Sequence, residues 1–284
     1  MIVVTGATGQ LGRLVVEGLL ERVPADQVAV VVRSAEKAAD LAARGLQVRT
    51  ADYSRPETLD GVFAAGDRVL LISGSEIGQR VTQHQAVIDA ATKAGVALLG
   101  YTSVLGGDLA TFGLADEHHA TEAAIRASGL PFVLLRNGWY TENYTGTLGQ
   151  TLEHGAVFAS AGEGRVASAT RADYAAAAVA VLTTDGHQNR AYELSGDTAW
   201  SLAEYAAEVA AQSGRPVVYR ELTPEQHVEL LLGAGLPQPF AETLVDVDAG
   251  IARGELAVAT GDLSRLIGRP TTALADTVRA ALQQ

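Results

Sequence analysis

Short apolar runs alternate with amphipathic stretches along the first half of the chain, and this alternation constrains the fold most strongly. The stretches between the runs are expected to form helices at residues 10–21, 34–45, 55–64, 79–95 and 115–129. Continuous runs rich in Val and Leu are typical of a parallel sheet that is buried on both faces. The pattern therefore predicts an α/β fold with a doubly wound parallel sheet. Its six predicted strands are residues 2–5, 28–33, 46–52, 68–73, 96–103 and 130–137.

The pattern loosens after about residue 150, where we expect a smaller C-terminal α/β subdomain. Helices are predicted at residues 171–186, 201–214 and 223–237, and short strands at 191–196 and 217–222. The expected division is a cofactor-binding domain over residues 1–150 and a substrate-cleft subdomain over residues 151–284. The two parts would interleave if strand 191–196 rejoined the main sheet.

Composition excludes several classes of function. With 284 residues, 48% of them hydrophobic, the chain is expected to be globular and to have a large core. The formal net charge of −12 argues against a nucleic-acid partner. The sequence has no cysteine, so it can form neither disulfides nor a cysteine-based metal site. Met1 leads directly into a predicted strand and no apolar run approaches ~20 residues, so we expect no signal peptide, no membrane span and a cytoplasmic location.

Three glycines lie between the first predicted strand and the first predicted helix, in the pattern G-x-x-G-x-x-G. Gly6 would turn the chain, Gly9 would let a pyrophosphate approach the helix start, and Gly12 would let helix and strand pack closely. An ordinary strand–turn–helix corner is the alternative. Placed in the first βαβ unit, the loop predicts a Rossmann-type dinucleotide site. Its expected contacts are Gly6, Thr8, Gly9, Gln10, Leu11 and Gly12.

The second predicted strand ends in Arg33, where sites for NAD usually carry an acidic residue. A cation there suits the 2′-phosphate of NADP(H), and we expect no carboxylate beside it to oppose that phosphate. Ser34 would cap the next helix. The alternative is a solvated surface arginine. The predicted cofactor is therefore NADPH.

Two further strand ends face the same crevice of such a sheet. Ser73, Gly74 and Ser75 follow the fourth strand, and their small side chains suit close approach to the cofactor ribose. Thr102 ends the fifth strand. An ordinary loop is the alternative for the first group.

The common Tyr-x-x-x-Lys catalytic pair is excluded. The only lysines are Lys37 and Lys93, and neither follows a tyrosine by four residues. A tyrosine activated by a neighbouring lysine therefore cannot be the proton donor.

Other side chains are candidates for that role. His118 shares a helix face with Glu122 and would titrate near neutral pH, unless it is a surface residue. No further ligand cluster lies near it, so we expect no metal site. After the sixth strand, an aromatic and polar segment would meet the nicotinamide or a flat substrate, or alternatively cap the core. The candidate residues are Asn137, Gly138, Trp139, Tyr140, Glu142 and Asn143, and Arg171 further along the chain.

Together the segments GATGQLG, YTS, LADEH, LLRNGWYTENY and ASATRADYAAAA resemble the NmrA-like atypical short-chain dehydrogenases/reductases. Within that family the chain is most similar to the bacterial type 2 NADPH-dependent quinone oxidoreductases. The resemblance covers nearly the whole chain. It implies NADPH bound by the glycine loop, by Arg33, by residues 73–75 and by residues 137–142. Many relatives carry a lysine where this chain has His118, which implies that His118 would take over its role.

Two functions remain open from the sequence. In the first, hydride passes from NADPH to a quinone in the interdomain cleft, and Tyr140, Asn143 or His118 donates a hydrogen bond to the forming oxyanion. In the second, the protein is a catalytically silent NADP(H) sensor that regulates a protein partner. Apolar helix faces serve a core and a dimer interface alike, so a homodimer is left open.

Overall fold

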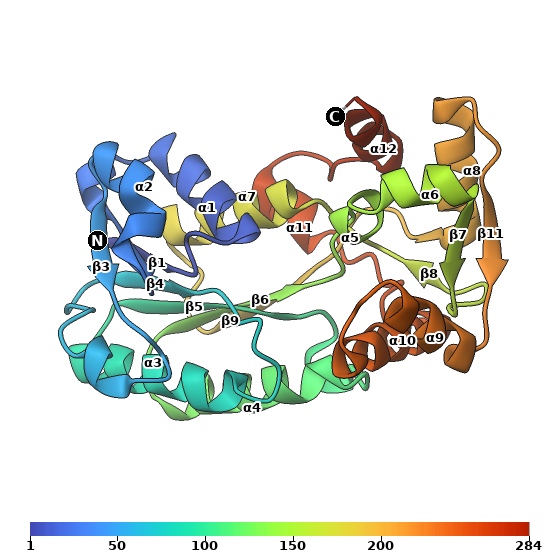
Figure 1. Ribbon diagram of the computed structural model, residues 1–284. Coiled ribbons are helices and arrows are strands. Elements are labelled where there is room, and N and C mark those ends of the chain that lie inside the picture. Colours follow the sequence, from blue (N-terminus) through green and yellow to red (C-terminus); the bar gives the residue numbers. More distant parts are fainter. Residues whose placement is uncertain (284) are drawn as a thin grey trace.

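A seven-stranded parallel sheet forms the centre of the protein (Figure 1). The structure is a computed structural model, and it describes residues 1–283. The strand order β3-β2-β1-β4-β5-β6-β9 reverses direction between β1 and β4, as in a doubly wound fold. This confirms the predicted fold class. The strands are β1 (Ile2–Thr5), β2 (Val28–Val32), β3 (Gln47–Thr50), β4 (Arg68–Leu71), β5 (Leu98–Val104), β6 (Phe132–Asn137) and β9 (Arg190–Leu194).

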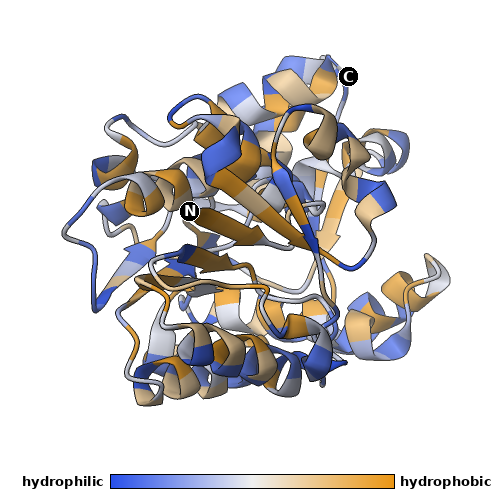
Figure 2. Ribbon diagram, turned by 90° about the vertical axis from the view of Figure 1, so that its left-hand side faces the viewer, coloured by the Kyte–Doolittle hydropathy of each residue, from blue (hydrophilic) through white to orange (hydrophobic). Residues whose placement is uncertain are grey.

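Helices cover both faces of this sheet, above and below it in Figure 1. Alternate residues of one strand enter different cores: Val4 packs in one hydrophobic cluster and Val3 in another. Figure 2 shows hydrophobic strands between helices whose outer sides are hydrophilic. One layer holds α1 (Gln10–Leu20), α2 (Ala39–Ala43), α7 (Arg171–Thr183) and α11 (Asp262–Ile267), and the other holds α3 (Arg80–Ala94) and α4 (Leu114–Ala127).

Most predicted helices correspond to helices of the structure. Gly95 has left-handed geometry at the end of α3, and Gly45 and Gly129 also have positive φ. One predicted helix is much shorter than expected, and another is divided. Residues 55–64 contain only the 3-10 helix η3 (Pro56–Leu59), and residues 34–45 divide into η2 (Ala35–Ala38) and α2. The remaining 3-10 helices are η1 (Ala25–Gln27) and η4 (Gly107–Leu109).

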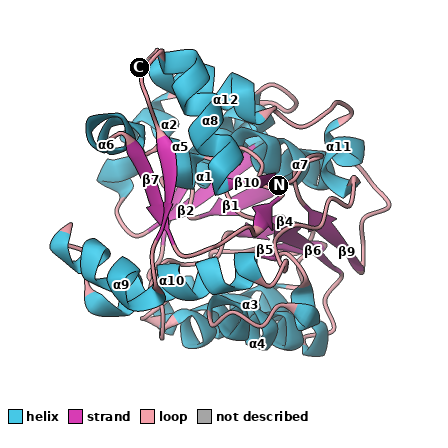
Figure 3. Cartoon of the chain, turned by 90° about the vertical axis from the view of Figure 1, so that its right-hand side faces the viewer, coloured by secondary structure: helices cyan, strands magenta, loops and turns pink. Residues whose placement is uncertain are grey.

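The C-terminal part forms a second, smaller group of elements, which lies beside the sheet in Figure 1 and in front of it in Figure 3. It contains a parallel pair, β7 (Ala156–Ala159) with β11 (Val218–Glu221), and an antiparallel pair, β8 (Arg165–Val166) with β10 (Trp200–Ser201). Strand β9 instead pairs with β6, so the chain returns to the main sheet after residue 150. The accompanying helices are α5 (Glu142–Thr145), α6 (Leu148–His154), α8 (Leu202–Ser213), α9 (Pro224–Gly233), α10 (Gln238–Ala252) and α12 (Leu274–Leu282).

Side-chain caps begin three of the later helices. Thr170 accepts a hydrogen bond from the Asp173 backbone N–H at the start of α7. Ser201 and Thr223 each form a reciprocal capping box, with Glu204 in α8 and Gln226 in α9. Within residues 1–283, no helix combines the length and apolar character needed to cross a membrane.

Candidate functional site

The turn from β1 into α1 brings the backbone very close to itself. Gly6 has a φ of +61°, and the Gly9 N–H donates to the Gly6 carbonyl at 3.0 Å. A Cβ on Gly12 would lie 2.2 Å from the Gly6 oxygen and 2.8 Å from the Ala7 Cα. Gly9 is the N-cap of α1, so the first backbone N–H groups of that helix have no acceptor within the helix. This arrangement is suited to bind a phosphate.

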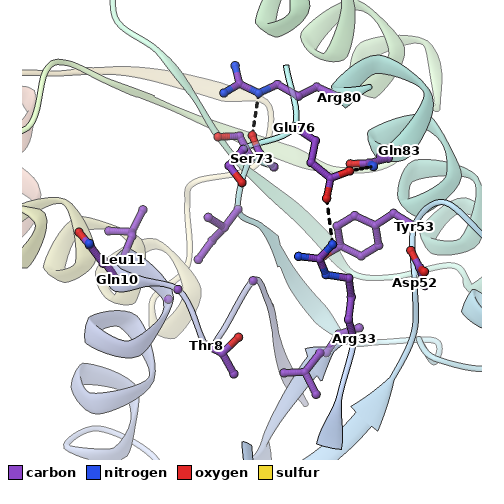
Figure 4. Close-up of a pocket in the computed structure, with 18 of the residues that line it drawn as sticks. Thr8, Gln10, Leu11, Arg33, Asp52, Tyr53, Ser73, Glu76, Arg80 and Gln83 are labelled. Carbon is purple, nitrogen blue, oxygen red and sulfur yellow. Dashed lines mark hydrogen bonds and ion pairs between the residues drawn. The ribbon is translucent and has the colours of Figure 1, made fainter. Parts of the chain in front are cut away.

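The loop opens into a cavity of about 790 Å³ at the carboxyl ends of the central strands (Figure 4). That volume lies within the usual range for small-molecule sites. Twelve residues predicted to contact cofactor or substrate line it: Gly6, Thr8, Gly9, Gln10, Leu11, Gly12, Arg33, Ser73, Gly74, Ser75, Tyr140 and Arg171.

Four predicted contacts lie outside the cavity lining. Thr102 Oγ1 accepts a hydrogen bond from the Ser73 N–H at 2.8 Å. A Cβ on Gly138 would lie 3.0 Å from Tyr174 Oη, so this glycine permits close packing. Asn137 is buried at the end of β6. Trp139 packs against the hydrophobic cluster of the C-terminal part, which matches the core-capping alternative.

Glu142 and Asn143 also lie outside the lining, and both hold Arg171. The Glu142 carboxylate accepts from the Arg171 backbone N–H at 2.8 Å. Asn143 Oδ1 accepts from Arg171 Nη2 at 3.1 Å. The Arg171 guanidinium carbon lies 4.5 Å from the centre of the Tyr140 ring. Glu142 and Asn143 therefore position Arg171. The Arg171 side chain in turn packs on the ring of Tyr140.

The sequence predicts three proton or hydrogen-bond donors, Tyr140, Asn143 and His118. Of these, Tyr140 lines the cavity. Burial raises the pKa of Tyr140, so the phenol stays protonated at neutral pH. Its ring meets Tyr174 edge to face, with 5.3 Å between ring centres. The ring is thus held on two sides, by Arg171 and by Tyr174.

The expectation that His118 titrates near neutral pH is wrong. Its side chain is buried, and Nδ1 shares a hydrogen bond with Tyr101 Oη at 2.7 Å. Burial, aided by the positive charge of Arg80, lowers the pKa of His118 to about 3. The imidazole is neutral and lies outside the cavity lining, so it is suited to support Tyr101 rather than to deliver a proton.

The expectation that no carboxylate lies beside Arg33 is also wrong. Glu76 Oε1 accepts a hydrogen bond from Arg33 Nη1 at 2.9 Å, and Asp52 lines the same cavity (Figure 4). Sequence reasoning missed Glu76 because the two residues are 43 positions apart. Ser34 stands at the N-cap position of η2 but makes no side-chain cap hydrogen bond within the described chain.

The cavity lining contains five more functional candidates that the sequence pattern did not reveal. Asp52 and Tyr53 follow β3, and the rule that parallel strands end at one edge could have found them. Arg80 and Gln83 lie in the first turns of α3, and they line the cavity together with residues 73–76 of the preceding loop. Phe240 of α10 enters the lining from the C-terminal part, which no local signal predicts.

The loop after β4 is held at both ends by side chains of α3 and α4. The Gly74 N–H donates to His84 Nε2 at 3.0 Å, and Arg80 Nε donates to the Gly74 carbonyl at 2.6 Å. The Gly78 N–H donates to Glu117 Oε1 at 3.0 Å. Because His84 Nε2 accepts, this imidazole is neutral, and burial together with the Arg80 charge lowers its pKa to about 4. In residues 1–283, no cluster of three or more His, Asp or Glu side chains is arranged to hold a metal ion.

Comparison with known proteins also indicates a dinucleotide-binding protein. A family model described as NAD(P)H-binding matches residues 6–185. Quinone oxidoreductase 2 of Escherichia coli is 49% identical over 278 residues, which cover 98% of this chain and 97% of that protein. An NmrA-like family domain-containing oxidoreductase of Aspergillus flavus is 28% identical, over 98% of this chain and 94% of that protein.

One solved structure is very similar over its full length. It is the crystal structure of the E. coli NADPH-dependent quinone oxidoreductase QOR2 complexed with NADPH. It has a TM-score of 0.97 and 48% sequence identity to this chain, with 100% of each chain covered.

Proposed function

The chain belongs to the NmrA-like, NAD(P)H-binding family, as its motifs predict, and on that premise we propose that it is an NADPH-dependent reductase that transfers hydride to a quinone. The observation that carries the proposal is the single cavity that joins the glycine loop, Arg33 and the Tyr140 ring. A relative with almost half of its residues identical is named for this activity and was solved with NADPH.

The residues present fit an NADPH molecule. Gly9, the N-cap of α1, has no side chain to keep a phosphate from the unpaired N–H groups at the helix start, and Gly12 lets the helix pack directly on the Gly6 carbonyl. Residues 6–12 would hold the pyrophosphate, Arg33 the 2′-phosphate and Ser73–Ser75 the adjoining ribose. Tyr140 and Arg171 would flank the nicotinamide end. When bound, NADPH supplies the hydride.

The protein would contribute orientation and one hydrogen bond. A quinone is a good hydride acceptor, so the site needs no strong acid, which agrees with the missing Tyr-x-x-x-Lys pair. The protonated Tyr140 hydroxyl would donate to the oxygen on which negative charge develops. Asn143 and His118 would act indirectly, because the first holds Arg171 and the second shares its hydrogen bond with Tyr101.

The C-terminal part would complete the acceptor site. We propose a cofactor-binding domain over residues 1–150 and an interleaved substrate-cleft subdomain over residues 151–284, whose α7, β9 and α11 pack on the main sheet, with the quinone between the two parts. Phe240 supports it, since this aromatic side chain lines the cavity from α10 and is 47% exposed. A flat quinone is the expected partner in that position. The chain would work in the cytoplasm.

Turnover with a panel of small quinones tests the proposal. NADPH binding is first established by calorimetry, and NADPH oxidation is then followed with each quinone. We expect oxidation well above the rate without protein, and faster turnover with NADPH than with NADH. Tight NADPH binding with no turnover of any quinone would contradict the reductase and favour the sensor.

A further inference from the structure

We propose that Glu76 is a positioning residue that holds Arg33 ready for the 2′-phosphate of NADPH. This rests on the proposed cofactor site and adds a residue that determines its specificity. The proposal starts from the ion pair that these two cavity-lining side chains form, with 2.9 Å between Arg33 Nη1 and Glu76 Oε1 (Figure 4).

Glu76 is itself held by a buried side chain. Gln83 Nε2 donates to Glu76 Oε2 at 2.8 Å and to Ser54 Oγ at 3.1 Å. The Gln83 side chain belongs to α3 and is only 7% exposed, so its position is determined by the core of the protein. A chain of contacts therefore runs from the rigid helix through Glu76 to the Arg33 guanidinium.

Arg33 needs such support because little else restrains it. It follows the end of β2, and its side chain is 73% exposed. An arginine has several rotatable bonds, and ordering them when a ligand binds reduces the affinity. A partner that orders the guanidinium in advance removes part of that cost. The planar guanidinium carries five N–H donors, so it can keep one carboxylate contact while other donors meet a phosphate.

Stability of the fold does not explain the pair. Glu76 is 45% exposed and Arg33 is more so, and exposed ion pairs contribute little to folding. Both residues instead line the cofactor cavity, where their geometry affects a ligand. The Glu76 carboxylate also repels a phosphate. Its contact with Arg33 should therefore raise the affinity for NADPH, whereas its charge should lower that affinity. Two substitutions can separate these effects.

The test is calorimetric titration of NADP⁺ and NAD⁺ into the wild type, Glu76→Ala and Glu76→Gln. Glu76→Ala removes both the contact and the charge, and should weaken NADP⁺ binding about two- to tenfold, the cost of ordering one long side chain. Glu76→Gln keeps an oxygen that accepts from Arg33 and removes the repulsion, so it should bind NADP⁺ at least as tightly as the wild type. NAD⁺ binding should stay the same in all three proteins.

Glu17→Ala is the matched control. It removes a carboxylate from another exposed ion pair, Arg44–Glu17, and changes the net charge equally. This control should bind both dinucleotides like the wild type.

Three results would overturn the proposal. NADP⁺ binding by Glu76→Ala that equals or exceeds that of the wild type would mean that Glu76 acts only by repulsion. An equal loss for NADP⁺ and NAD⁺ would mean that the effect is not directed at the 2′-phosphate. Failure of the wild type to bind NADP⁺ would overturn the cofactor site as well. The titrations contain no quinone, so their outcome does not depend on whether the protein reduces quinones.

Discussion

The guanidinium carbon of Arg171 lies 4.5 Å from the ring centre of Tyr140, and both side chains line the same cavity. Arg171 is the first residue of α7 and is held by Glu142 and Asn143. A cation packed on an aromatic face limits how the ring can turn. The pair therefore presents the Tyr140 hydroxyl in a defined orientation, which is what a preorganised hydrogen-bond donor requires.

Tyr140→Phe should lower kcat for quinone reduction by about tenfold or more, since removing one oxyanion donor in other enzymes costs ~100- to 1000-fold. The KM for NADPH should change little, because the ring remains. Tyr144→Phe is the control in the same segment, since Tyr144 packs against Trp200 and Tyr205 in the C-terminal core. Equal rates for Tyr140→Phe and the wild type would exclude Tyr140 as the donor.

Gly12→Ala should abolish dinucleotide binding and lower the free energy of unfolding by about 1–3 kcal/mol, because the added methyl group would overlap the Gly6 carbonyl. Gly149→Ala in α6 is the control, because a Cβ there meets nothing within 4 Å. Titration with NADP⁺ and chemical denaturation measure the two effects. Normal NADP⁺ affinity in Gly12→Ala would contradict the close approach of helix and strand.

Arg33→Asp should weaken NADPH binding while NADH binding stays equal or improves, since the new carboxylate repels a 2′-phosphate and can accept from a 2′-hydroxyl. The ratio of the two dissociation constants, measured by titration, reports this directly. An unchanged ratio would show that Arg33 does not contact the phosphate.

His118 should make stability depend on pH in acid. Its pKa is about 3 in the fold, below the unfolded value of about 6.5, so the unfolded chain binds more protons between these values. The free energy of unfolding should therefore be highest above the unfolded pKa and fall as the pH drops through this window, by up to about 1.4 kcal/mol per pH unit from this residue.

His118→Gln should flatten that slope, and Tyr101→Phe should not, because it removes the hydrogen bond but keeps the titrating imidazole. Denaturation curves between pH 5 and 6 compare the three proteins. Identical slopes for the wild type and His118→Gln would mean that the imidazole is not held neutral by burial.

Local signals predict much of this fold. Val- and Leu-rich runs locate the buried inner strands of the sheet, because a strand buried on both faces must be apolar throughout. The edge strands β3 (QVRT) and β9 (RAYEL) are more polar and more exposed, and their positions follow from the alternation of strands and helices. The helix predicted over residues 55–64 is too long. Only Pro56–Leu59 form a helical turn there, and the residues after it form a loop.

The residues of the site also differ in how well the sequence predicts them. The glycine loop and Arg33 are read from one strand–turn–helix unit, whose geometry is local. Glu76, Gln83 and Phe240 reach the cavity through tertiary packing of separate elements, and the neutral state of His118 follows from its burial. No spacing in the sequence carries that information.

The most direct measurement is the stoichiometry of the reaction with the purified protein, NADPH and one small quinone. We expect one hydroquinone formed for each NADPH consumed, at a rate proportional to protein concentration and strongly reduced in Arg33→Asp. NADPH that binds but is consumed no faster than in buffer would contradict quinone reduction in this cavity.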